Sequence, residues 1–172
     1  MKRLAVVLIL FLFVLAPCAS YAEYRIAVVD LYRALNESNA GKRAKTDLES
    51  LLKSKEASVD DKRKTIENLK AGLDKQSSII SAEARKTKEA DLERLMRDYQ
   101  RMLADSQTEL KKKESDLTGD ILKELRELIN KIGEEEKLSL VLEHMEGLVL
   151  FSDKTLDITD KVIERYNASG KK

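Results

Sequence analysis

Residues 42–136 contain no proline and only three glycines, and lysine and glutamate crowd them. Proline and glycine are the residues that most readily interrupt a helix, so this stretch can form very long helices. In its second half the apolar residues follow a rhythm of four and three, with Ser106 and Lys113 in two of its positions: Leu92, Met96, Tyr99, Leu103, Leu110, Leu117, Ile121, Leu125, Leu128 and Ile132. That spacing places them on one stripe and is typical of a coiled-coil-like helix.

Lysines replace apolar residues at some positions of the stripe, and one less charged segment divides the helical stretch into two halves. Lysines occupy apolar slots at Lys55, Lys62 and Lys113. The run Gln76–Ala82 lowers the charge density, and Ser81 followed by Glu83 offers the cap of a new helix. We therefore predict an antiparallel helical hairpin over residues 42–136 that turns near residues 75–82. Because so narrow an apolar stripe buries little surface, we expect the two arms of the hairpin to be flexible.

The two ends of the chain have strand character instead. Residues 24–30 and 138–143 are rich in β-branched and apolar side chains, and residues 148–151 follow Gly147 as a further strand. A helical turn is expected at residues 31–35, a polar connection at 36–41, and a terminal helix from the cap residues at 157–160 to Tyr166. The fold class is α+β, with residues 23–41 and 137–172 forming one β-rich body.

The first 22 residues follow the plan of a cleaved secretory signal peptide. A basic start precedes an apolar run from Leu4 to Ala16, and the small residues Ser20 and Ala22 predict cleavage before Glu23. Cys18 could instead belong to a lipoprotein box, but Pro17 immediately before it fits that box poorly. We expect export of an unlipidated chain without cysteine or proline.

Composition excludes several classes of function. Residues 23–172 carry 30 basic against 31 acidic side chains, which disfavours nucleic-acid binding. The one histidine, His144, has no second histidine or cysteine to form a metal site or a catalytic dyad, and we expect it in a surface loop. No glycine-rich phosphate loop is present. We therefore expect neither an enzyme nor a bound cofactor.

The strand-forming ends supply only about 40 residues of globular body, which is below what usually folds alone. Without disulfides or a metal, oligomerisation is the remaining way to complete a core. The residues themselves predict only that the chain is not a monomer.

These features together resemble the Skp/OmpH family of periplasmic chaperones. The resemblance rests on the leader, Ile26–Asp30, the charged hairpin, Leu138–Glu143 and Leu156–Asp160 followed by Val162 and Ile163. It implies a homotrimer in which strands of three subunits form a small β-barrel body and three hairpins enclose a cavity. It also implies a periplasmic holdase that keeps unfolded outer-membrane β-barrel proteins soluble without ATP.

The distal half of the hairpin is the expected client-binding region. Residues 62–101 carry eleven basic against seven acidic side chains, a bias that would steer an acidic client. The candidate contacts are Arg63, Lys64, Lys70, Lys75, Ile79, Ile80, Arg85, Lys86 and Lys88. Lys112 and Lys113 are candidates for contact with lipopolysaccharide or an anionic membrane surface, although a solvated helix face is the commoner role of such a lysine run.

One alternative stays open. A structural coiled-coil protein of the cell envelope, acting as a spacer or adaptor without chaperone activity, would have a similar helical middle. It would favour a continuous seam, whereas this seam is broken at Lys55, Lys62 and Lys113.

Overall fold

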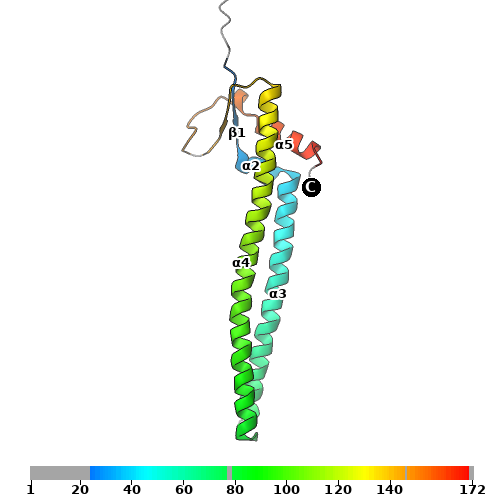
Figure 1. Cartoon of the computed structure of the whole chain (residues 1–172), viewed down its shortest axis with the longest axis vertical. Helices are drawn as coiled ribbons and strands as arrows, with labels where there is room; N and C mark the ends of the chain where they lie inside the picture. Colours follow the sequence, from blue (N-terminus) through cyan, green and yellow to red (C-terminus); the bar gives the residue numbers. More distant parts are fainter. Residues whose placement is uncertain (1–23, 77–78, 146, 171–172) are drawn as a thin grey trace, which may run out of the picture.

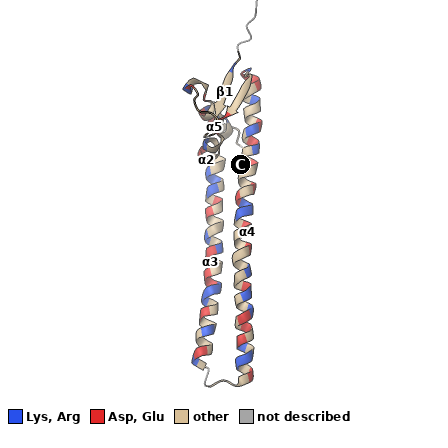
Figure 2. Ribbon diagram, turned by 90° about the vertical axis from the view of Figure 1, so that its left-hand side faces the viewer, with Lys and Arg blue, Asp and Glu red and all other residues tan. Residues whose placement is uncertain are grey.

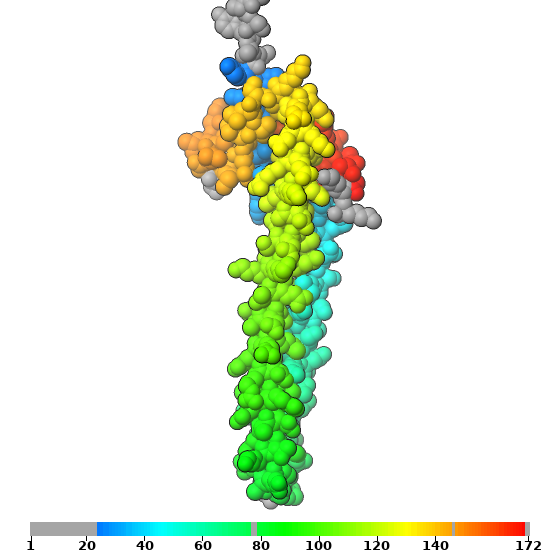
Figure 3. Space-filling model, viewed as in Figure 1, coloured from blue at the N-terminus to red at the C-terminus, as the bar shows by residue number. Residues whose placement is uncertain are grey.

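One long helical hairpin projects from a small body. The computed structural model describes residues 24–76, 79–145 and 147–170. The two arms are α3 (Asn39–Gln76) and α4 (Ala82–Glu135), which lie antiparallel and meet far from the body (Figure 1). At 1.5 Å per residue they are roughly 57 and 81 Å long. The space-filling view shows a narrow rod that widens only at the body (Figure 3). The expected long hairpin and small sheet are confirmed.

The body contains a two-stranded parallel sheet whose strands come from opposite ends of the chain. Strand β1 (Ile26–Val29) pairs with β2 (Leu140–Glu143) so that Ile26 lies opposite Leu140. On the other side of β1, the Ile158 N–H donates to the Val28 carbonyl at 2.9 Å. Strand β1 therefore has neighbours on both sides, and within the described residues no strand lies beyond the outer edge of β2.

The connection between strand and hairpin is tighter than the sequence suggested. Helix α2 (Leu31–Glu37) is capped by Asp30, and only Ser38 separates it from α3. The Ser38 hydroxyl donates to the Leu35 carbonyl and accepts from the Gly41 N–H, at 3.0 and 3.1 Å. A Cβ atom at residue 41 would lie 1.7 Å from that carbonyl oxygen, so this close approach requires glycine. The prediction of a polar connection at residues 36–41 is wrong. Because Ser38 caps the next helix, α3 begins at Asn39, directly after it.

The core lies where the upper part of α4 passes through the body. Ile121, Leu125, Ile129 and Ile132 recur every three or four residues and are all buried. They pack against residues from every other part of the body: Ala27, Val29, Leu31, Ala34, Ala40, Ile158, Val162 and Tyr166. The hairpin is therefore anchored by its own second arm, which ends inside the core.

The C-terminal part of the chain closes the body. The 3₁₀ turn η1 (Lys154–Leu156) precedes α5 (Thr159–Ala168), and α5 packs on α2 and α4. The Tyr166 hydroxyl donates to the Glu124 carboxylate at 2.6 Å, and burial together with that bond raises the pKa of Tyr166. The expected terminal helix is therefore present and fixed to the arm.

The segment expected as a further strand, residues 148–151, is irregular in the structure. Leu150 and Phe151 are 91% and 88% exposed. Their strand-forming side chains have no partner strand in the described chain, and an unpaired segment gains nothing from an extended backbone. That expectation is therefore wrong for the isolated subunit.

A fully buried hydroxyl joins the two ends of the chain. Thr159 Oγ1 accepts from the Asp30 N–H at 2.9 Å and donates to the Asp157 carboxylate at 2.5 Å. Thr159→Val keeps the shape but leaves the Asp30 N–H without its partner, whereas the Asp157 carboxylate keeps its bond from the Thr159 N–H. We expect a loss of about 2 kcal/mol of unfolding free energy. The exposed Thr46, which bonds only the Lys42 carbonyl, is the matched control. Urea denaturation that finds equal costs for Thr159→Val and Thr46→Val would contradict this role.

Candidate functional site

The seam between the two arms is apolar near the body and partly ionic in the middle. Lys55 and Lys62 occupy seam positions of α3, as the spacing predicted, and both are half-buried. The Lys55 ammonium lies 2.6 Å from the Glu109 carboxylate of α4. A hollow of about 330 Å³ opens beside them, and Asp98, Met102 and Asp105 are among its lining residues. In this zone the seam combines the Lys55–Glu109 ion pair with half-buried apolar residues such as Val59 and Leu103.

Replacing both Lys55 and Lys62 by leucine should stiffen this zone. Leucine would continue the apolar seam, and Glu109 keeps access to water because half of its side chain is exposed. We expect slower amide hydrogen exchange at residues 52–66 and 98–110. Exchange that is unchanged, or faster, in the double variant would show that the ionic seam already packs as tightly as an apolar one.

Several predicted client-binding cations are held in ion pairs along their own helix. Arg63 and Lys64 both contact Asp60, and Arg85 contacts Glu89. The pKa of Asp60 is lowered mainly by the hydrogen bond from Lys64 and next by the one from Arg63. The same hydrogen bonds raise the pKa of Lys64 and of Arg63. The three cations are exposed, so solvent screens these pairs and another anion can take the place of the acidic partner.

The remaining predicted contacts lie nearer the tip of the hairpin. Lys70, Lys75 and Lys86 are exposed, whereas Lys88 is half-buried and its ammonium lies 2.6 Å from the Gln76 side-chain oxygen on the opposite arm. Ile79 is 83% exposed while Ile80 is half-buried. Ser81 caps α4 by accepting from the Ala84 N–H. The structure thus spreads the predicted residues over the outer third of α3, the turn and the first two turns of α4 rather than gathering them into one pocket.

Lys112 and Lys113 lie on α4, well away from the tip, and both are exposed. Lys112 contacts Asp116 one turn further on, and that hydrogen bond raises its pKa. Nothing in the described residues gathers further cations around this pair into an enclosed anion site.

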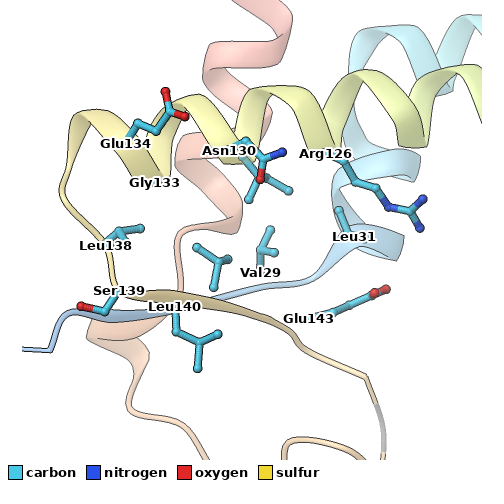
Figure 4. Close-up of a pocket in the computed structure, with 12 residues that line it drawn as sticks. Val29, Leu31, Arg126, Asn130, Gly133, Glu134, Leu138, Ser139, Leu140 and Glu143 are labelled. Atoms are coloured by element: carbon cyan, nitrogen blue, oxygen red, sulfur yellow. The ribbon is translucent and has the colours of Figure 1, made fainter.

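The sequence did not single out an apolar surface on the body as a candidate site. Its exposed side chains follow β2 and the loop beyond it: Leu140, Leu142, Met145, Leu148, Leu150 and Phe151. A hollow of about 570 Å³ lies beside β2, between the sheet and the end of α4 (Figure 4). Arg126, Asn130 and Glu134 line its α4 side, and Val29 and Leu31 lie across from them. The unbroken apolar run at residues 148–151 could have predicted this apolar surface, but we interpreted it as a further strand of the body.

The part of the chain that the structure describes offers neither a metal site nor a membrane span. No group of histidine, cysteine or acidic side chains there could hold a metal ion. No helix there is both long and apolar enough to cross a membrane. His144 lies in an exposed loop, as expected.

Comparison with known proteins identifies the family. The family model described as outer membrane protein (OmpH-like) matches residues 25–166. The chain belongs to this family. An uncharacterized protein of Aquifex aeolicus (strain VF5) is 25% identical over 141 residues, which cover 82% of this chain and 85% of that one. The expected resemblance to the Skp/OmpH family is thereby confirmed.

A solved structure shows the same fold. It is the crystal structure of a Caulobacter crescentus CB15 protein proposed to be an OmpH-like outer membrane chaperone, which is 23% identical in sequence. The two structures superpose with a TM-score of 0.79, and the match covers 86% of each chain. The body with one projecting hairpin is therefore a fold that this OmpH-like relative also has.

Proposed function

We propose that this OmpH-like protein is an ATP-independent holdase chaperone of the periplasm. Its clients would be unfolded outer-membrane β-barrel proteins, which it would keep from aggregating between its helical arms. Family membership and the described role of the Caulobacter relative favour a chaperone over an enzyme. The apolar run that precedes residue 23 supports export, because it has the plan of a signal peptide.

Two features support the proposal together: the arms project beyond the core, and the body leaves the edge of β2 and its apolar side chains exposed. The hairpin extends far beyond the core, so most of its surface serves no packing purpose within the subunit (Figure 1). At the other end, large apolar side chains lie beside the open edge of β2. Such an edge is a template for pairing with another chain. Assembly of several bodies through this surface would place several arms around one space.

A homotrimer is the assembly that we propose, with strands of three subunits forming a closed barrel. Closure would cover the open edge of β2 and the exposed residues Leu140, Leu142, Leu150 and Phe151 in the same step. Three hairpins would then offer a client many weak contacts at a high effective concentration. The nine candidate residues from Arg63 to Lys88 remain our proposed client contacts. Lys112 and Lys113 remain a proposed second contact, for lipopolysaccharide or an anionic membrane surface.

Suppression of aggregation tests the activity directly. An outer-membrane β-barrel protein diluted from urea scatters light as it aggregates, and one trimer of residues 23–172 per client should abolish that signal without ATP. A protein of similar size and charge without arms serves as the control. Scattering that is unchanged by a molar excess would contradict the holdase and favour the structural spacer.

A further inference from the structure

Residues 147–153 lie in the connection between β2 and η1 and have no regular secondary structure. We call them the open loop. They belong to the orange projection at the side of the body in the space-filling view (Figure 3). Three large apolar side chains of the open loop are exposed, those of Leu148, Leu150 and Phe151. Phe151 is the only phenylalanine of residues 23–172.

The backbone of the open loop is as accessible as its side chains. The N–H groups of Leu148 and Val149 both donate to the Met145 carbonyl, at 3.0 and 3.3 Å. No backbone group of residues 150–152 makes a hydrogen bond within the part of the chain that the structure describes. This segment can therefore pair with another backbone without breaking a hydrogen bond of its own fold.

The exposed apolar residues of the arms lack such a backbone. Leu52 and Met96 lie within α3 and α4, and charged side chains recur along both of these helices (Figure 2). At the tip, the Ile79 N–H donates to the Gln76 carbonyl at 3.0 Å. An enzyme that binds an extended chain would first have to break hydrogen bonds at these places, whereas the open loop requires no such step.

Endoproteases cut exposed loops and bind the chain that they cut in an extended form. We propose that the open loop is the cleavage site through which an endoprotease with a preference for large apolar side chains removes unassembled subunits. Cleavage adds one water molecule across the peptide bond after Phe151, which leaves a carboxylate on residue 151 and an amine on residue 152. This inference rests on the assembly proposed above, because closure of the barrel would cover the same loop.

A single cut at this position would detach the part of the body that closes the core. Ile158, Val162 and Tyr166 all follow the open loop in the chain and are buried in the core. The Ile158 N–H also donates to the Val28 carbonyl of β1. After the cut these contacts no longer act within one chain, so the high effective concentration that the loop provides is lost. We expect residues 152–172 to dissociate from the cut subunit.

Two variants of equal net charge test the cleavage site. Leu140→Asp with Leu142→Asp should prevent assembly through β2 and leaves the open loop unchanged. Leu150→Asp with Phe151→Asp should also prevent assembly, but it removes two apolar side chains of the open loop. Light scattering and circular dichroism check that both variants are monomers with the wild-type helix content. The wild type, diluted below the concentration at which it assembles, gives the same test without a substitution.

Limited digestion with chymotrypsin, followed by mass spectrometry of the fragments, is the first measurement. We expect the β2 variant to be cut after Phe151 about tenfold faster than the loop variant is cut anywhere, and the assembled wild type to be protected at this bond. In cells that export both variants, pulse-chase labelling should find the shorter half-life for the β2 variant.

Equal digestion rates for the two variants, first cuts within the arms, or equal half-lives in cells would overturn the cleavage site. A cut subunit that retains residues 152–172 on a sizing column would overturn removal by a single cut. Equally rapid cleavage of the assembled and the diluted wild type would overturn the dependence on assembly. A wild type that never assembles but is cut rapidly after Phe151 would contradict the proposed trimer and support the cleavage site.

Discussion

Replacing Leu150 and Phe151 by aspartate together is expected to convert the proposed trimer into monomers. The two side chains are 91% and 88% exposed in the isolated subunit, although they are large and apolar. Burying a leucine or phenylalanine side chain contributes about 1.5–3 kcal/mol, and an unpaired carboxylate in the same place costs more than that. A closed trimer repeats the contact three times, so the effect on assembly is multiplied.

The matched control for this pair is the double variant Leu52→Asp and Ile79→Asp. These residues are 42% and 83% exposed and lie on the arms rather than on the body. Light scattering coupled to size-exclusion chromatography should find monomers for the first variant and the wild-type assembly for the second. If the Leu150 and Phe151 variant still assembles while the Leu52 and Ile79 variant does not, the interface lies on the hairpin. That result would contradict the proposed barrel.

Leu125→Ala should be the most destabilising single substitution in the hairpin. Leu125 is fully buried where α4 crosses the body, and it is among the residues that tie the long arm to the core. Removing its side chain leaves a cavity in a core with few layers, so we expect the unfolding free energy to fall by about 3 kcal/mol. The melting temperature should fall by roughly 9 °C for a chain of this size.

Urea unfolding at one fixed protein concentration measures this effect, because the proposed assembly would make stability depend on concentration. Leu52→Ala is the control, since its side chain is 42% exposed on the arm and should cost less than about 1 kcal/mol. Similar costs for the two substitutions would mean that the hairpin is stabilised along its length rather than anchored in the body.

Local sequence patterns were enough to predict the hairpin. The absence of proline and the spacing of apolar residues such as Leu110, Leu117 and Ile121 reflect short-range physics, which one helix obeys regardless of its surroundings. The Ser81 cap is of the same kind, because its partner is the N–H of Ala84 three residues away. Lys55 was also placed correctly in the seam, although its partner Glu109 lies 54 residues away and could not be inferred.

One error depends on an absent partner strand, and the other misses concern local side-chain contacts that composition alone does not predict. Residues 148–151 have the composition of a strand, but whether they form one depends on a neighbour that the described chain does not supply. Residues 36–41 have the composition of a loop, and the hydrogen bonds of Ser38 decide otherwise. At the candidate site the missed signal was also local, because Asp60 precedes Arg63 and Lys64 by three and four residues, a spacing that favours ion pairs on a helix.

Native mass spectrometry directly tests whether the protein is a trimer that holds a client. Residues 23–172 would be measured alone and after mixing with an outer-membrane β-barrel protein diluted from urea. We expect a trimer that gains the mass of one client and keeps that client in solution. A dimer, a monomer or an open polymer that shows no added mass would contradict it and would leave the structural spacer as the better description.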